Sequence, residues 1–233
     1  MLYSNEIFIP TQEQVLFHWP RNHTDIKDSI DQYIARSDSN GVFAEIIRNN
    51  TKAGALQDVN KYLLSPDVNS KGRVFLPNDP IPVFVDGTHG FALGCQKKDS
   101  GKTLWLAMMG LGFLEEGTNH VTTHIKNNPH QIFPVIRQLQ VLTSSANKIE
   151  KKEKSEILAE LHDLRWERIL ITNVVNWARK SSFQKIYSIP AEKCRWARKE
   201  DLERYKIRYN TSAKRLGFKK DEASGYWVFK TIT

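Results

Sequence analysis

Cysteine is scarce in this chain: Cys95 and Cys194 are the only two among 233 residues. Two cysteines are too few for the disulfide framework that stabilises many small secreted domains. Residues 1–10 include the acidic Glu6 and offer neither a basic start nor a small-residue cleavage site, so no secretory signal is expected. Both absences favour a reducing, cytoplasmic location. Cys194 lies in a strongly basic segment, where we expect it to be exposed and without a chemical role.

Long apolar runs are also absent. The longest apolar stretch, residues 104–114, is shorter than the roughly 18 residues that a membrane-spanning helix needs. Gly110 and Gly112 interrupt this stretch, and glycines inside a strand indicate close packing or a bulge. The sequence therefore predicts a buried strand here and no membrane span.

The motifs of several enzyme classes are missing as well. No glycine-rich loop ends in Lys-Ser or Lys-Thr, which removes the usual signature of a nucleotide-binding loop. No His-Glu-x-x-His helix is present, and His120 and His124 stand in a Val-Thr-Thr context that favours a strand. We therefore predict no metal site.

Positive charge is concentrated in the last third of the chain. Residues 1–145 carry 13 Lys and Arg against 14 Asp and Glu, whereas residues 146–233 carry 21 against 12. A basic surface attracts anions such as nucleic acid, an acidic protein or the phosphates of a cofactor. The alternative is that these side chains simply solvate helix faces.

Apolar periodicity predicts an α+β fold with a mixed, mostly antiparallel sheet flanked by helices. Helical spacing occurs over residues 24–40, 43–47 and 56–64, so residues 1–70 are predicted to form a helical segment that packs on the sheet. Residues 71–233 are predicted to form the α+β part of what is one compact domain overall. Short β-rich runs predict an antiparallel meander over residues 73–76, 81–85, 91–96, 103–113 and 120–125, with a hairpin connection at 97–102 and a further strand at 131–142.

The C-terminal third alternates strands and helices. Trp166, Leu170, Val174 and Trp177 share one face of a helix that is predicted to end near Lys180. Before it, the charged residues 147–156 predict a solvated loop or a helix start. After it, we predict a strand over 185–189, a basic helix over 202–216 and a final strand over 226–232.

Residues 131–231 resemble the C-terminal half of the GNAT superfamily of N-acetyltransferases. The order of elements is similar, and residues 213–218, Ala-Lys-Arg-Leu-Gly-Phe, resemble the helix-ending signature of that family. Gly217 also has a local explanation, because a helix often ends at a residue with positive φ. The resemblance implies an acyl-CoA N-acyltransferase fold.

The resemblance also implies a function. The chain would transfer an acyl group from coenzyme A or a carrier thioester, with acetyl-CoA or another acyl-CoA as cofactor, to an amine of a small molecule or peptide. The strand residues Gln138, Leu139 and Gln140 would bind the pantetheine arm. The family's phosphate-binding loop corresponds to residues 161–168, which contain no glycine, so Arg165 and Arg168 would contact the phosphates through their side chains.

Candidate catalytic residues follow from the same resemblance. The family's tyrosine acid corresponds to Ala213 here, and Tyr209 lies one helical turn earlier on the same side. A base near the acceptor amine would come from Glu115, Glu116 or His120. The alternative for Tyr209, and for Tyr205 on the same row, is a packed core tyrosine.

A second hypothesis is a non-catalytic module of the same fold that uses residues 193–220 to bind nucleic acid or a partner protein. Trp196 stands among Arg195, Arg198 and Lys199, and an aromatic side chain between cations is typical of single-strand binding. Trp196 is alternatively a partly buried anchor of its loop. In that case the cations pair with the nearby acidic residues, which are Glu200, Asp201 and Glu203.

Overall fold

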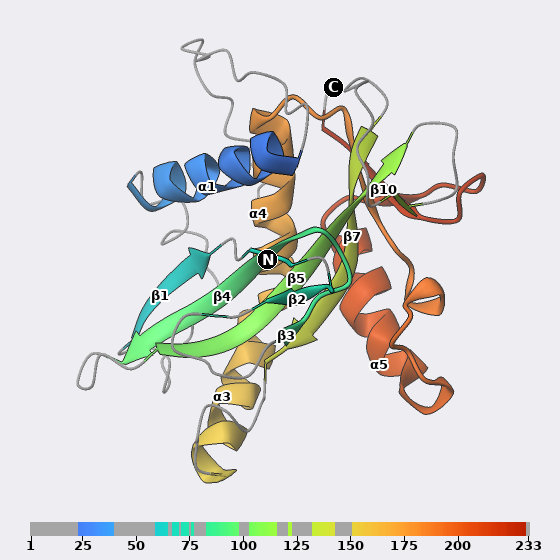
Figure 1. The fold of residues 1–233 in the computed structure, drawn as a ribbon. Coiled ribbons are helices and arrows are strands. Elements are labelled where there is room, and N and C mark those ends of the chain that lie inside the picture. Colours follow the sequence, from blue (N-terminus) through green and yellow to red (C-terminus); the bar gives the residue numbers. More distant parts are fainter. Residues whose placement is uncertain are drawn as a thin grey trace, which may run out of the picture.

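The computed structural model shows an α+β fold in which a mixed, mostly antiparallel sheet is flanked by helices (Figure 1). It describes residues 23–39, 59–64, 67–69, 71–74, 76, 83–97, 103–115, 121–122, 132–142 and 151–231. Within these ranges, no helix is long and apolar enough to cross a membrane.

Helices and strands alternate in an order close to the predicted one. The first half contains α1 (His23–Ser39), β1 (Val59–Leu64), β2 (Arg73–Val74), β3 (Val83–Phe84), β4 (His89–Lys97), β5 (Thr103–Glu115), β6 (Val121–Thr122) and β7 (Ile132–Val141). The second half contains α3 (Lys151–Leu164), α4 (Trp166–Lys180), β8 (Lys185–Ser188), the short turns η3 (Ala191–Lys193) and η4 (Lys199–Asp201), α5 (Leu202–Lys206), the π-helical turn η5 (Ile207–Thr211), α6 (Ser212–Arg215), β9 (Lys219–Lys220) and β10 (Trp227–Lys230).

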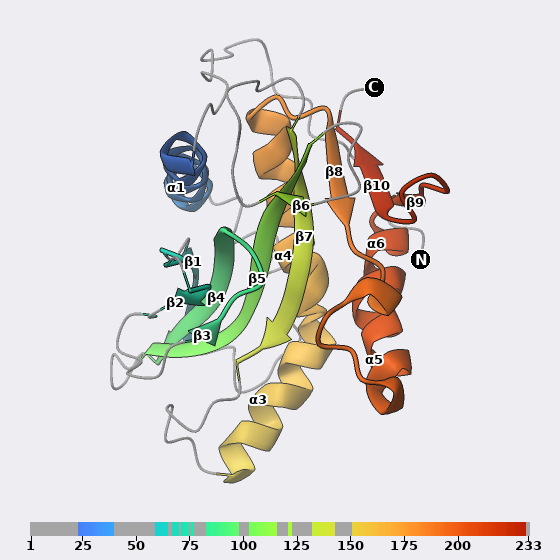
Figure 2. The same ribbon diagram turned by 45° about the vertical axis from the view of Figure 1, so that its right-hand side comes forward.

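The main sheet has the order β1-β4-β5-β7-β8-β10-β9, and β6 pairs with β5 beside this path. Every neighbouring pair in it is antiparallel except β7 and β8, which run parallel. A parallel pair needs a long crossover connection, and here α3 and α4 provide it. Figure 2 shows α5 and α6 beside β7, beyond the end of β8.

One face of the sheet is covered by α1 and α4. The residues Trp166, Leu170, Val174 and Trp177 are all buried, because their spacing places them on the side of α4 that faces the core. Two buried hydrogen bonds join α1 to α4: the Tyr33 hydroxyl donates to Asn173 Oδ1 at 2.9 Å, and Trp177 Nε1 donates to Ser29 Oγ at 3.0 Å. The helices therefore pack as a layer with paired polar groups.

The opposite face carries the two-stranded ribbon of β2 and β3 (Figure 1). A second core cluster lies under it and includes Val74 and Val85 from this region, together with Ala92, Trp105 and Met108 from β4 and β5. Successive residues of a strand point to opposite faces, so Phe91 and Leu93 on either side of Ala92 belong to the larger core under the helices.

Gly110 allows the chain before β4 to approach the sheet. A Cβ at this position would lie 2.8 Å from the carbonyl oxygen of Asp86 and 3.2 Å from Gln138 Cβ. The register between β5 and β7 also shifts at this point, between Gly110 and Leu111. The predicted close packing and bulge are both present.

Several predictions of helices and strands are confirmed, and two of them are wrong. The helix near residues 24–40, the helix ending at Lys180 and the strand at 131–142 are present, and Gly217 has a φ of 88° after the end of α6. The helix predicted over residues 56–64 is wrong, because residues 59–64 form β1, which pairs antiparallel with β4 along its whole length. The segment 73–85 is also not part of the main meander, because β2 and β3 form a separate ribbon.

Other predictions lie on residues outside the described ranges. These are the helix over residues 43–47, most of the hairpin connection at 97–102 and most of the strand at 120–125. The charged segment that begins at residue 147 is a helix start, since α3 begins at Lys151. The division of the chain near residue 70 stays a prediction.

Candidate functional site

The parallel strands β7 and β8 diverge after a short contact. They pair only at Val135 with Tyr187 and at Ile136 with Ser188. One more bond follows, from the Ile189 N–H to the carbonyl of Ile136 at 3.0 Å, and Pro190 then leads the chain into η3. On β7, Arg137 is the extra residue of the bulge opposite β5, and such a residue bends its strand. On the side of β7 that faces β8, no strand in the described ranges pairs with the chain beyond Ile136.

Two side chains from η5 form hydrogen bonds with the backbone of β7 on this free edge. The N–H of Leu139 donates to the Tyr209 hydroxyl at 2.7 Å, and Arg208 Nη1 donates to the Leu139 carbonyl at 3.3 Å. A buried backbone group without a partner is costly, so these contacts replace the missing ladder bonds. They also mark the place where an extended, amide-bearing ligand would find a donor and an acceptor.

A pocket of about 190 Å³ lies at this divergence. It is lined by aromatic rings, two carboxamides, one guanidinium and the free edge of β7, contributed by Phe84, Gln138, Leu139, Gln140, Trp196, Tyr205, Arg208 and Tyr209. This volume is smaller than the roughly 300–1,000 Å³ of typical small-molecule sites, so the pocket has room for part of a ligand.

Tyr209 is the buried tyrosine of the pocket, with 1% of its surface exposed. Burial raises the pKa of its hydroxyl well above the ordinary value, and the neighbouring Cys194 acts in the same direction. The oxygen accepts the Leu139 N–H and lies 3.6 Å from the Cys194 thiol, which donates to it. Both contacts use the hydroxyl as an acceptor, so its own hydrogen can be donated into the pocket. The prediction that Cys194 is exposed is wrong: it is 6% exposed, because its loop folds back onto Tyr209.

Arg208 is held between charge and aromatic rings. Its guanidinium lies 5.4 Å from the ring centre of Trp166 and 5.6 Å from that of Tyr205, within cation–π range. Its Nε lies 3.9 Å from a carboxylate oxygen of Glu167. Burial raises the pKa of the Glu167 carboxyl, although the helix N–H and the charge of Arg208 act to lower it. A largely buried ion pair therefore closes this side of the pocket.

Gln138 ties the segment before β4 to β7. Its Oε1 accepts the Asp86 N–H at 2.6 Å, and its Nε2 donates to the Phe84 carbonyl at 3.2 Å and to Gln140 Oε1 at 2.8 Å. The ring of Phe84 in turn meets Trp196 edge to face, with centres 5.3 Å apart. Phe84 and Trp196 are 41% and 39% exposed, so this aromatic contact lies at the outer side of the pocket.

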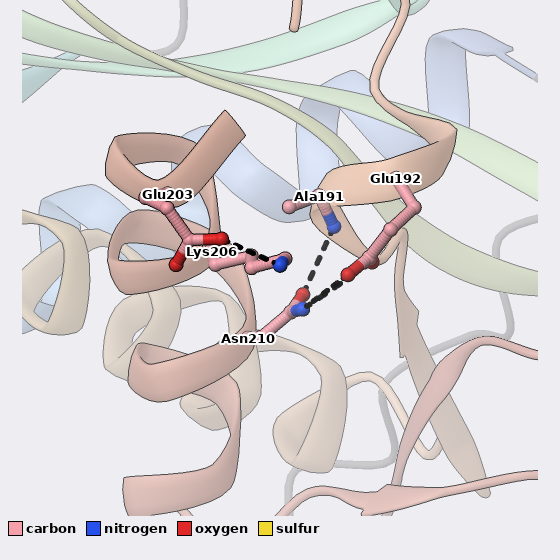
Figure 3. A network of polar contacts seen from close by, with 5 residues as sticks. All are labelled: Ala191, Glu192, Glu203, Lys206 and Asn210. Atoms are coloured by element: carbon pink, nitrogen blue, oxygen red, sulfur yellow. Dashed lines mark hydrogen bonds and ion pairs between the residues drawn. The ribbon is translucent and has the colours of Figure 1, made fainter. Parts of the chain in front are cut away.

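Asn210 fixes the loop that carries Trp196. Its Oδ1 accepts the N–H of Ala191 at 2.9 Å and Trp227 Nε1–H at 3.2 Å, and its Nδ2 donates to the Glu192 carboxylate at 3.3 Å. Figure 3 shows Asn210 and Glu192 pointing toward each other from η5 and η3. η3 is therefore attached to the helix that contributes Arg208 and Tyr209.

The basic segment around Trp196 is only partly neutralised. Arg204 pairs with Asp201 at 3.8 Å and Lys206 with Glu203 at 2.6 Å, as the sequence suggested for these acidic residues. The hydrogen bond and charge of Glu203 raise the pKa of Lys206 (Figure 3). No ion pair within the described part of the chain involves Arg195, Arg198 or Lys199, all of which are exposed.

The structure brings one group of the predicted site residues together. Gln138, Leu139, Gln140 and Tyr209 all line the pocket. Arg165 and Arg168 do not line it: Arg165, with a φ of 55°, is the single residue between α3 and α4, and Arg168 lies in the first turn of α4. Glu115 ends β5, but its side chain, like Glu116 and His120, lies outside what the structure describes.

Phe84 is a pocket residue that the sequence analysis did not single out, and Arg208 entered that analysis only within the basic range 193–220. A phenylalanine in a short β-rich run has the pattern of an ordinary core residue, so no local signal marked it. Tyr205 did carry a signal, because it precedes Tyr209 by four residues on the same helix row, and the two rings stack with centres 6.0 Å apart. Within the described residues, no cluster of His, Cys, Asp and Glu is suited to hold a metal ion.

Comparisons with protein-family models, with curated protein sequences and with solved structures gave no match to this chain.

Proposed function

We propose that this protein is a GNAT-like acyltransferase, which binds the pantetheine arm of an acyl thioester along the free edge of β7 and transfers the acyl group to an amine. The observation that carries the proposal is the divergence of β7 and β8 after Ile136, with a pocket opening beside the backbone of Leu139, which is bonded on this side by side chains and by no described strand. The finer assignment of the fold to the acyl-CoA N-acyltransferases is part of this proposal.

The chemistry of the free edge supports this choice of ligand. The pantetheine arm contains two amides, and each can pair with a strand edge as another strand would. Leu139 offers one N–H and one carbonyl at the pocket, and both are now bonded by side chains of η5. A ligand amide would replace these contacts with equivalent ones, which keeps the cost of displacement small.

Tyr209 is the proposed acid of the reaction. The acceptor nitrogen attacks the thioester carbonyl, a C–N bond forms, and the C–S bond breaks with the electron pair leaving on sulfur. Tyr209 donates its hydroxyl hydrogen to this sulfur and is then reprotonated from water. A base removes the proton of the amine, and Glu115, Glu116 and His120 remain the candidates for it. The hydroxyl of a tyrosine is protonated at neutral pH and so has a hydrogen to donate, and burial raises the pKa of Tyr209 further, which makes it a weaker acid.

The test is thermal unfolding with S-acetyl-pantetheine and with acetyl-coenzyme A. A ligand at a hundred times its Kd adds about 2.7 kcal/mol, or roughly 5–10 °C in Tm for a chain of this size. Gln140→Trp fills the pocket and should abolish the shift. Gln184→Trp makes the same exchange at an exposed position outside the pocket and should retain it.

Catalysis is tested separately with Tyr209→Phe. This variant should still bind the thioester, while kcat falls about a hundredfold, which is the usual contribution of a positioned acid. Absence of any thermal shift with either thioester, in a folded wild-type protein, would rule out the proposed function.

A further inference from the structure

We propose that the exposed cations Arg195, Arg198 and Lys199, beside Trp196 at the outer side of the pocket, bind the phosphate end of the acyl donor. This inference rests on the proposed function, because it concerns the same ligand at the same site. It assigns a phosphate-binding role to a surface patch that lies outside the pocket lining.

The first argument is that the pocket itself offers no free positive charge. Arg208 is the single charged residue among those that line it. Its Nη1 is bonded to the Leu139 carbonyl, and its Nε faces the Glu167 carboxylate at 3.9 Å. A phosphate brought to Arg208 would have to break the pairing with Glu167 and leave that largely buried carboxylate without its cation, which is costly.

The start of α4 is equally unsuited to a phosphate. A helix N-terminus attracts anions through its free N–H groups, but here Glu167 places its own carboxylate in the first turn. The helix also follows α3 after the single residue Arg165, whose carbonyl accepts the N–H of Arg168 at 2.8 Å. The Glu167 carboxylate, paired with Arg208, therefore already lies at the end of the helix where a phosphate would bind.

The patch around Trp196 has the opposite character. Arg195 lies over the Trp196 ring, with its guanidinium carbon 5.2 Å from the ring centre, and Trp196 lines the pocket. Arg198 and Lys199 follow within three residues and are exposed, without an ion pair in the described ranges. Trp196 therefore joins the pocket to a basic segment whose three cations form no ion pair with a carboxylate in the described ranges. Phosphate oxygens pair well with guanidinium groups.

The phosphate has two possible sources, free coenzyme A and the phosphopantetheine of a carrier protein. The experiment measures the affinities of S-acetyl-pantetheine, which has no phosphate, of acetyl-coenzyme A and of an acetylated carrier protein by titration calorimetry. The variant is Arg195→Ser/Arg198→Ser/Lys199→Ser. The matched control is Lys214→Ser/Arg215→Ser/Lys219→Ser, which removes three exposed cations from α6 and the edge strand β9.

We expect at least one phosphorylated donor to bind the wild-type protein tenfold or more tightly than S-acetyl-pantetheine at low salt. The patch variant should reduce this advantage to less than threefold and leave S-acetyl-pantetheine unchanged, and the control should keep it. The advantage should also shrink as salt rises, because the patch is exposed. The donor that loses affinity identifies the source of the phosphate.

Three results would overturn the inference. In the first, the patch variant still binds the phosphorylated donors more tightly than S-acetyl-pantetheine by the same factor as the wild type. In the second, the control variant loses as much of this affinity difference as the patch variant does. The third is that the patch variant loses only the binding of a single-stranded oligonucleotide, which would assign the patch to nucleic acid. If no thioester binds at all, the proposed function fails first, and that outcome is distinct from the other three.

Discussion

Replacing Tyr209 by phenylalanine should destabilise the fold by about 1–2 kcal/mol. The substitution keeps the ring, which is 1% exposed and stacks on Tyr205, and removes only the oxygen that accepts the Leu139 N–H at 2.7 Å. A buried donor left unpaired costs about 1–3 kcal/mol. The lower part of that range applies because the adjacent pocket of about 190 Å³ has room for a water molecule that would accept this N–H.

Equilibrium unfolding in urea measures this loss, with an unchanged m-value as the sign that only stability has altered. Tyr205→Phe is the matched control. Its hydroxyl forms no hydrogen bond with any residue the structure describes, so the change should stay within about 0.5 kcal/mol. Amide exchange gives a second readout, since the Leu139 amide should exchange faster in Tyr209→Phe. Equal stabilities of the two variants, with unchanged protection of Leu139, would refute the account of the free edge.

Three further predictions concern the same region. Gly110→Ala should cost about 1–3 kcal/mol of unfolding free energy in urea, because its Cβ would lie 2.8 Å from the carbonyl oxygen of Asp86; a loss below 0.5 kcal/mol would contradict that contact. Asn210→Ala should cost about 1–3 kcal/mol and speed amide exchange at Ala191, which loses its acceptor, whereas unchanged protection there would show that another group bonds this N–H. Burial raises the pKa of Glu167, so its protonated form is favoured by folding, and its stabilising contribution is present at low pH and lost as pH rises through the folded pKa. Glu167→Gln should therefore be more stable than wild type at pH 7, and the difference in unfolding free energy should vanish below about pH 4. Urea titrations at several pH values measure this difference. A difference that grows on acidification would contradict the raised pKa of Glu167.

The pocket is surrounded by polar side chains that are hydrogen-bonded to one another or to the backbone. Gln138 and Asn210 each bind two or more partners from other segments. Side chains therefore hold the pocket wall in place where the backbone hydrogen bonds between β7 and β8 have ended. A wall of this kind is rigid while its polar groups are paired.

Local patterns were enough for a large part of the fold. The spacing of Trp166, Leu170, Val174 and Trp177 predicted α4 because a helix face depends only on residues three and four positions apart. Gly217 predicted the end of α6 for a similar reason, since positive φ is a property of one residue. Gln138, Leu139, Gln140 and Tyr209 were named from the resemblance, and these four make up half of the residues that line the pocket.

Only the tertiary structure decided the remainder. Residues 59–64 have apolar spacing that fits a helix, yet they form a strand because β4 supplies a hydrogen-bonding partner more than 25 residues away in the sequence. Cys194 is buried because its loop meets Tyr209, and Phe84 reaches the pocket because Gln138 binds the backbone of its segment. These outcomes depend on contacts between distant segments, whose geometry is set by the strand bulge at Arg137 and the turn at Pro190. No window of neighbouring residues contains that information, which is why the sequence determined the elements and the packing determined the site.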